Sequence, residues 1–318
     1  MMEVRRAAVV GAGIMGHSIA QLFAQAGIPV CLTDSEPARL AEAQRRIAGN
    51  LSLFVEHGLL ARNQAIESLQ RVATANLHDA VSKADFVTEC VTENLGLKQT
   101  LFEELDRIAP AHAIFASNTS SLPLAKIGQK VKNKSRLIVT HYFNPPHIVP
   151  IVEVAPFEST SPEVTQVTLD LMVRLGQQPV HLKKSLPGFL VNRVQSALVR
   201  EVLSLLEQDV ASIEDIDKAV RGVIGFRLAA VGPLEVMDFG GLDTWLTVAR
   251  NLFPEISSQT DAPTLLLTKV AKGELGMKSG QGFYKWHAED DSSCTTEKVR
   301  ERDERLLNLL KLLYRQQC

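Results

Sequence analysis

The side chains best suited to chemistry in this sequence are a histidine and a glutamate, His141 and Glu153. His141 follows the apolar residues 137–139, a run typical of a buried strand, so it should lie just past a strand's carboxyl end. In open α/β sheets, ligands bind at that edge. An imidazole held by a carboxylate is a general base suited to neutral pH, because the carboxylate fixes the tautomer and stabilises the imidazolium.

The segment between the two residues predicts how they could meet. Pro145 and Pro146 stop the strand, and the apolar residues Ile148, Ile151, Val152 and Val154 rebuild an extended segment that can carry Glu153 back to the same edge. A histidine after a strand is, however, more often a loop residue than a catalyst. The function of the pair therefore depends on what precedes it.

A dinucleotide-binding motif opens the chain. A short buried strand, residues 7–10, leads into Gly-Ala-Gly-Ile-Met-Gly and then into apolar residues at helical spacing. In this context the glycines allow a tight turn, backbone approach to a pyrophosphate, and packing of helix on strand. A second strand ends in Asp34, whose carboxylate suits the ribose hydroxyls of NAD and would repel the extra phosphate of NADP. The predicted cofactor-binding residues here are Gly11, Gly13, Ile14, Met15, Gly16 and Asp34.

The order of elements predicts two domains. Strands alternate with helices through residue 140, which indicates an α/β fold of Rossmann type with a doubly wound parallel sheet over residues 1–186. A charged helical pair at about 38–70 interrupts it, and is either a solvated surface or a flap over the substrate. From residue 188 onward strands disappear, so we expect a smaller all-helical domain over residues 187–318.

Composition narrows the class of protein. The 318 residues are 45% hydrophobic and 22% charged with a formal net charge of -2, so no bulk attraction to nucleic acid or to a membrane surface is expected. The apolar runs are shorter than a membrane span, and the four cysteines show no metal-binding spacing. We expect a cytoplasmic protein with reduced cysteines and no metal.

Further motifs follow at strand ends. They are Glu93-Asn94 with Lys98, the polar turn of residues 117–121, the segment from His141 to Pro145 with Glu153, and Gly188-Phe189 with Asn192-Arg193. Taken in this order with the glycine motif, they resemble the 3-hydroxyacyl-CoA dehydrogenase family over nearly the whole chain. The resemblance implies an NAD-dependent oxidoreductase of fatty acid metabolism that acts on a small-molecule substrate. It also implies a homodimer formed through the helical domain.

The resemblance assigns roles to individual residues. It implies that His141 is the catalytic base, that Glu153 is its partner, and that Ser120 and Asn192 contact the substrate oxygen or the imidazole. It places Glu93, Lys98, Ser120 and Asn144 along the nicotinamide ribose side of the cofactor site. This agrees with alcohol oxidation, in which a base removes the hydroxyl proton as hydride leaves the same carbon.

The substrate is where the sequence departs from the pattern. Members that use CoA thioesters commonly carry lysines in a flap segment resembling residues 54–59, where this chain has Glu56, His57 and Leu59. Other segments resemble the lambda-crystallin and gulonate dehydrogenase branch, which acts on free acids, whereas residues 117–121 and 278–284 resemble the bacterial 3-hydroxybutyryl-CoA enzymes. We expect an L-3-hydroxyacyl-CoA such as 3-hydroxybutyryl-CoA first, a free hydroxy acid as the alternative, and a catalytically silent NAD-binding protein as the third hypothesis. Arg227 is a candidate carboxylate-binding residue, or an interdomain or dimer salt-bridge residue.

Overall fold

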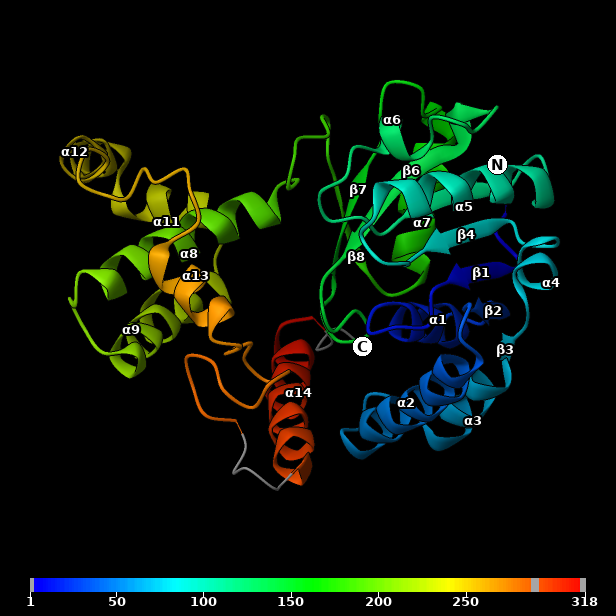
Figure 1. Cartoon of the computed structure of the whole chain (residues 1–318), viewed down its shortest axis with the longest axis horizontal. Coiled ribbons are helices and arrows are strands. Elements are labelled where there is room, and N and C mark those ends of the chain that lie inside the picture. Colours follow the sequence, from blue (N-terminus) through cyan, green and yellow to red (C-terminus); the bar gives the residue numbers. More distant parts are fainter. Residues whose placement is uncertain (1–2, 287–291, 315–318) are drawn as a thin grey trace. The chain divides into compact units, whose positions relative to one another are not determined.

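Eight strands form one sheet in the order β3-β2-β1-β4-β5-β6-β7-β8 (Figure 1). The doubly wound order reverses at β1, between β2 and β4, which creates the crevice where such sheets bind ligands. In chain order the strands are β1 (Ala7–Val10), β2 (Val30–Thr33), β3 (Val72–Thr74), β4 (Phe86–Glu89), β5 (Ile114–Ser117), β6 (Leu137–Tyr142), β7 (Ile151–Ala155) and β8 (Gln178–His181).

Both faces of the sheet are buried, which is why its central strands read as continuous apolar runs. Along β1, Ala7 and Val9 belong to one apolar core, and Ala8 and Val10 belong to the core on the other face. The first core includes residues of α1 (Gly16–Gln25), α2 (Pro37–Glu56) and α7 (Pro162–Arg174). The second includes residues of α4 (Leu77–Val81), α5 (Leu95–Ile108) and α6 (Leu124–Ile127). The predicted fold class is confirmed.

One pair of strands departs from the predicted parallel sheet. β7 pairs antiparallel with β6, and the register places His141 opposite Glu153. The reason is the length of the connection, because residues 143–150 are too few for the crossover that a parallel neighbour needs. This reversal brings Glu153 back to the strand edge where His141 lies.

The computed structural model describes residues 3–286 and 292–314, in two units. The first runs from the N-terminus to Asn192 and includes Leu306–Tyr314, and the second takes residues 193–305. The predicted boundary at residue 187 lies a few residues before this division. The last helix also differs from the prediction, because the apolar residues near its end pack within the first unit. Within the described ranges, no helix is long and apolar enough to cross a membrane.

Helices and turns make up the second unit. Its described elements are most of α8 (Val191–Glu207), α9 (Ile213–Ala219), the π-helical turn η2 (Val220–Gly225), α10 (Phe226–Leu228), α11 (Pro233–Gly240), α12 (Leu242–Leu252), α13 (Thr264–Ala271) and the first part of α14 (Ser292–Tyr314). The first unit also contains α3 (Arg62–Gln70), which follows α2 and completes the helical pair predicted at 38–70, and a short 3-10 turn η1 (Lys134–Arg136).

Candidate active site

The predicted histidine and glutamate meet. His141 Nδ1 lies 2.7 Å from Glu153 Oε2, and the side chains are 7% and 0% exposed. The rings of Phe143 and Phe189 pack on the imidazole, with centroids 4.6 Å and 5.4 Å from its own. Because Nδ1 faces the Glu153 carboxylate, Nε2 is the ring nitrogen that can exchange a proton with another molecule.

Glu153 also holds the start of α8. Its second oxygen, Oε1, accepts hydrogen bonds from the backbone N–H groups of Leu190 at 2.9 Å and Val191 at 2.8 Å. These are donors that the first turn of a helix leaves unpaired. Burial raises the pKa of Glu153, but the hydrogen bonds from His141 and from these two amides outweigh it, so the pKa lies below its ordinary value. The carboxylate is therefore ionised at neutral pH.

The polar turn after β5 is organised by Glu93. Glu93 Oε1 accepts hydrogen bonds from Thr119 Oγ1 at 2.5 Å, and from the N–H groups of Ser120 and Ser121, each at 3.1 Å. Burial raises the pKa of Glu93, but the Thr119 hydroxyl and the Lys98 ammonium lower it by more. The pKa of Glu93 therefore lies below its ordinary value. The backbone oxygen of Ser120 accepts from Asn192 Nδ2 at 3.4 Å, so these two predicted site residues are joined.

A buried charge cluster lies behind this turn. The Lys98 ammonium is 2.5 Å from Glu89 Oε1 and 3.2 Å from Glu93 Oε2, and the side chains of Lys98 and Glu89 are 1% and 0% exposed. Ser117 Oγ donates to Glu89 Oε2 at 2.6 Å. Burial raises the pKa of Glu89, and Lys98 and Ser117 offset part of that rise. The cluster fixes Lys98 between two carboxylates.

Three residues of this region were not predicted from the sequence. From the sequence, Glu89 is predicted only to be part of a buried strand. A carboxylate within such an apolar run nevertheless indicates a buried ion pair. Asn118 Oδ1 accepts from the N–H of Tyr142 at 2.9 Å and so ties the polar turn to the residue after His141. Phe189 has a positive φ of 50° and packs on the imidazole, a placement that no sequence pattern indicates. Asn144, which was predicted, is exposed.

The glycine loop fits a dinucleotide. A Cβ on Gly16 would lie 1.7 Å from the backbone oxygen of Gly11, and a Cβ on Gly11 would lie 2.7 Å from that of Cys90, so neither position tolerates a side chain. Gly11 also has a φ of 104°, which favours glycine. Gly13 has nothing within 4 Å of a Cβ, which leaves its backbone open to a ligand, and Ile14 is 59% exposed. Met15 is the N-cap of α1. The three glycines thus fit the tight turn, the open backbone and the close packing of helix on strand that pyrophosphate binding requires.

Asp34 lines a cavity of about 830 Å³ beside this loop. Its oxygens accept from the N–H groups of Ala12 at 2.8 Å and Glu36 at 3.0 Å. The same cavity is also lined by Arg39, a cation of the kind that could bind the extra phosphate of NADP, but its guanidinium is 2.8 Å from Glu36 Oε1. Two carboxylates with a neutralised arginine make this cavity suited to an unphosphorylated ribose.

This geometry leads to a prediction for Asp34→Asn. The amide keeps one acceptor for the loop but loses the charge that repels a phosphate, so we expect KM for NAD to rise about tenfold and the preference for NAD over NADP to fall by at least as much. We expect kcat with NAD to change less than twofold. Steady-state kinetics with both cofactors test this, with Glu67→Gln on the exposed side of α3 as the control. An unchanged cofactor preference would contradict the role of Asp34.

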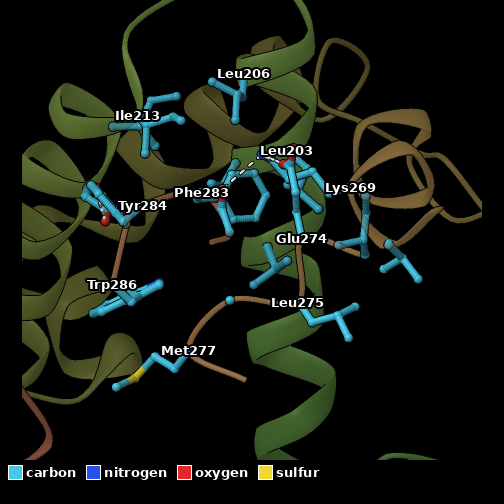
Figure 2. Close-up of a pocket in the computed structure, with 18 of the residues that line it drawn as sticks. Leu203, Leu206, Ile213, Lys269, Glu274, Leu275, Met277, Phe283, Tyr284 and Trp286 are labelled. Carbon is cyan, nitrogen blue, oxygen red and sulfur yellow. Dashed lines mark hydrogen bonds and ion pairs between the residues drawn. The ribbon is translucent and has the colours of Figure 1, made fainter. Parts of the chain in front are cut away.

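The second unit contains a cavity of another character. It measures about 610 Å³ and is lined mainly by apolar side chains of α8, α9, α13 and the turn of residues 274–286 (Figure 2). Two pairs of polar side chains in its lining bind each other: Lys269 Nζ lies 2.8 Å from Glu274 Oε2, and the Tyr284 hydroxyl donates to Asp217 at 2.8 Å. Polar groups already paired in this way leave little to orient a reacting substrate, so we place the chemistry in the first unit.

Two other predictions concern groups outside the dyad. Arg227 lies on α10, directly after the π-helical turn η2, and its Nε donates to the backbone oxygen of Val223 at 3.3 Å. Its role as a carboxylate ligand stays a prediction. Among the side chains that the structure describes, those of residues 3–286 and 297–314, no three of His, Cys, Asp or Glu gather in a way that could hold a metal ion.

Comparison with known proteins identifies the family. The model of the 3-hydroxyacyl-CoA dehydrogenase NAD binding domain matches residues 6–185, and that of the 3-hydroxyacyl-CoA dehydrogenase C-terminal domain matches residues 188–286. The 5-formyl-3-hydroxy-2-methylpyridine 4-carboxylate 5-dehydrogenase of Mesorhizobium japonicum is 32% identical, over 94% of this chain and 96% of that protein. The probable 3-hydroxybutyryl-CoA dehydrogenase of Bacillus subtilis is 34% identical, over 89% of this chain and 98% of that protein.

A solved structure agrees over almost the full length. The crystal structure of 5-formyl-3-hydroxy-2-methylpyridine 4-carboxylic acid 5-dehydrogenase, described as an NAD+ dependent dismutase, superposes with a TM-score of 0.91 at 31% identity, covering 98% of this chain and 99% of that one. The likeness in fold and the matches to the NAD binding domain and the C-terminal domain therefore point to the same family. The chain belongs to the 3-hydroxyacyl-CoA dehydrogenase family of NAD-dependent dehydrogenases that act on a CH–OH group.

Proposed function

We propose that His141 is the proton acceptor for the alcohol substrate, with Glu153 as its partner. The 2.7 Å contact between His141 Nδ1 and Glu153 Oε2 carries this proposal, because it leaves Nε2 free to take the hydroxyl proton. When bound, NAD supplies the acceptor for the hydride that leaves the same carbon. Glu153 would offset the charge that develops on the imidazole.

The polar turn would hold the substrate. Ser120 and Asn192 are joined by a hydrogen bond, and Glu93 fixes the backbone of Ser120 on one side, so both side chains start from defined positions. A hydroxyl and an amide are suited to binding an alcohol or carbonyl oxygen. Such positioning contributes to rate by keeping the reacting atoms in line. Glu93 and Asn144 are proposed to line the nicotinamide ribose side, as the family pattern implies. Lys98, which is buried, would act there through its 3.2 Å contact with Glu93.

For the substrate, we propose a small free carboxylic acid that carries the reacting hydroxyl or carbonyl group. The support is twofold. The flap segment carries Glu56, His57 and Leu59 where CoA-using members commonly carry lysines, which weakens a clamp for CoA phosphates. The structure with a TM-score of 0.91 is that of an enzyme named for a pyridine carboxylate rather than for a CoA thioester.

An L-3-hydroxyacyl-CoA, the substrate expected first from the sequence, is the second candidate. It is supported by the family and by the 34% identical relative named as a probable 3-hydroxybutyryl-CoA dehydrogenase. NADH oxidation followed by absorbance separates the candidates when acetoacetyl-CoA is compared with free 3-keto acids and aromatic formyl carboxylates. Turnover of the free acids alone supports the first candidate, and fast turnover of the thioester supports the second. Silence on all of them would favour a structural NAD-binding protein.

Arg227 provides a test of carboxylate recognition. If its guanidinium binds the free carboxylate, Arg227→Ala should raise KM for the acid about tenfold or more while kcat changes little, since a charge-assisted pair contributes to binding. Arg227→Lys should recover only part of the affinity, because an ammonium lacks the bidentate geometry. Arg221→Ala on the preceding π-helical turn serves as the control. An unchanged KM would remove Arg227 from the site.

A homodimer through the helical unit is proposed as well. Several of its large apolar side chains are strongly exposed in the single chain, among them Phe226 at 77%, Leu234 at 74%, Phe239 at 82% and Phe253 at 71%. Monomeric proteins seldom leave so many large apolar groups in water. Light scattering is expected to give twice the chain mass of 34.9 kDa, and a value equal to that mass would reject the dimer.

A further inference from the structure

Three buried side chains connect the loop after His141 to the glycine loop. His147 Nδ1 lies 2.9 Å from Ser18 Oγ, and Ser18 Oγ lies 3.2 Å from His17 Nε2. His17 Nδ1 in turn lies 2.8 Å from the backbone oxygen of Gly13. The side chains of His147, Ser18 and His17, which we call the histidine link, belong to residues that are 5%, 1% and 7% exposed. Hydrogen bonds shielded from water in this way are stronger than exposed ones.

The Gly13 end gives the histidine link a direction. A carbonyl oxygen only accepts hydrogen bonds, so His17 carries a proton on Nδ1. Burial lowers the pKa of His17 by more than the hydrogen bond to Gly13 raises it. Of the charged groups that face the ring from α2, Arg46 lowers this pKa and Glu42 raises it. The His17 ring is therefore neutral at neutral pH, and its Nε2 has no proton.

The other proton positions follow from that assignment. Because His17 Nε2 can only accept, Ser18 Oγ donates to it. A hydroxyl has one proton, so Ser18 Oγ accepts in turn from the Nδ1–H of His147. Each side chain of the link thus has a single role, and every donor faces toward the glycine loop.

The first end of the link lies at the proposed pyrophosphate site. Gly13 lines the cavity of about 830 Å³ that also contains Asp34, and its backbone is open to a ligand. His17 lies in the first turn of α1, the helix end that favours an anion. A bond between the His17 ring and the Gly13 oxygen holds the glycine loop against this helix end.

The second end of the link lies in the loop that carries predicted site residues. His147 belongs to a compact turn, in which the N–H groups of residues 148 and 149 donate to the Pro145 oxygen at 3.0 Å and 2.9 Å. The same loop begins with Phe143, whose ring packs on the proposed base, and continues with Asn144. Whatever holds His147 therefore also holds this loop.

From these contacts we propose that the histidine link is a positioning device, which fixes the glycine loop and its bound dinucleotide against the loop that follows the base. The proposal rests on the proposed function and extends it to His147, Ser18 and His17. These residues act through the two loops, so they are positioning residues. Because the nicotinamide and the alcohol carbon must be held in line, a displacement of one loop against the other slows hydride transfer.

The test separates hydrogen bonding from packing at His147, whose ring also packs on Phe54 with centroids 6.0 Å apart. His147→Phe keeps an aromatic ring and loses the Nδ1 donor. His147→Asn loses the ring and keeps an N–H donor at the position of Nδ1. The dissociation constant of NADH is measured by fluorescence titration, and the rate of hydride transfer by stopped-flow absorbance with the substrate that the wild type turns over. Circular dichroism and thermal melting verify that each variant is folded.

We expect His147→Phe to raise the dissociation constant of NADH about fivefold, as the loss of one buried hydrogen bond implies. Its hydride transfer should slow about tenfold or more, since misplaced reacting atoms cost rate. His147→Asn should stay within about twofold of the wild type in both quantities. The opposite pattern, with the phenylalanine variant intact and the asparagine variant impaired, would show that the ring matters only for packing and would overturn the proposal.

Ser18→Ala interrupts the link while both imidazole rings remain in place. It should match His147→Phe, and the double variant should be no worse than the more affected single variant, because both remove the same connection. The control is Ser68→Ala on α3, a residue 2% exposed whose Oγ donates to the Gln64 oxygen at 2.7 Å. It should match the wild type. Additive effects of Ser18→Ala and His147→Phe would overturn the proposal, and so would an NADH affinity of Ser18→Ala within about twofold of the wild type. These two results decide the matter if His147→Asn does not fold.

Nitrogen-15 NMR of labelled histidine gives a readout that does not depend on turnover. The His147 signals are assigned by their absence in His147→Phe. In the wild type with NADH, His147 should carry a proton on Nδ1, and Ser18→Ala should remove that preference. A His147 Nδ1 without a proton in the wild type would overturn the proposal. Failure of the proposed function looks different, since the wild type would then turn over none of the free acids, while NADH affinity and the NMR signals would still test the link.

Discussion

His141→Ala is expected to lower kcat by on the order of 10³-fold while leaving the dissociation constant of NADH nearly unchanged. The loss follows from removing the group that takes the hydroxyl proton, since general acid–base catalysis contributes about 10²–10⁴-fold. NADH binding should persist because the glycine loop joins β1 to α1 and Asp34 follows β2, whereas the dyad lies on β6 and β7. Stopped-flow kinetics and NADH fluorescence titration measure the two quantities.

The control for this variant is His181→Ala, an exposed histidine of β8. It should retain full activity. If His141→Ala kept more than a tenth of the wild-type kcat, another group would have to be the base, and the dyad would be structural.

Glu153→Gln is the second large effect, because it reverses the hydrogen bonding of the imidazole. The carboxylate accepts from Nδ1–H, whereas an amide with its oxygen held by the Leu190 and Val191 N–H groups would turn its NH2 toward Nδ1. That favours the tautomer with the proton on Nε2, which is unable to accept the substrate's proton. We expect kcat to fall on the order of 10²-fold or more, as wrong-tautomer variants of such dyads show.

The same variant should alter stability at acid pH. The pKa of Glu153 is lower in the folded chain than in the unfolded one, so its ionisation stabilises the fold above the ordinary glutamate pKa of about 4.3. That contribution is lost as pH falls through the folded-state pKa. Glu153→Gln should therefore lose less stability than the wild type between about pH 5 and pH 3 in urea unfolding, and parallel curves would contradict the linkage.

The parts of the site predictable from sequence are those fixed by local pattern. The glycine loop, Asp34 and the return of Glu153 toward His141 follow from strand ends, turn residues and apolar spacing, and the structure brings each to the expected edge. The direction of β7 was not captured in the predicted fold class, although the eight-residue connection required an antiparallel pair.

The remaining parts depend on contacts between distant segments. Glu89 and Lys98 lie on a strand and on the helix after it, and only packing reveals that both are buried together. The placement of Phe189 on the imidazole depends on a left-handed backbone turn, and the cover of Phe54 by Leu307 joins residues far apart in the chain. Periodicity describes one element at a time and does not indicate which surfaces such elements share.

The antiparallel ladder between β6 and β7 limits how this enzyme can vary. Because successive residues of a strand point to opposite faces, an insertion that slipped the pairing by a single position would turn the carboxylate of Glu153 to the other side of the sheet. Loop transplants between relatives are thus tolerated only when the ladder keeps its alignment. Insertions that bulge out of residues 143–150 leave the pairing intact, whereas those absorbed by either strand are expected to abolish turnover.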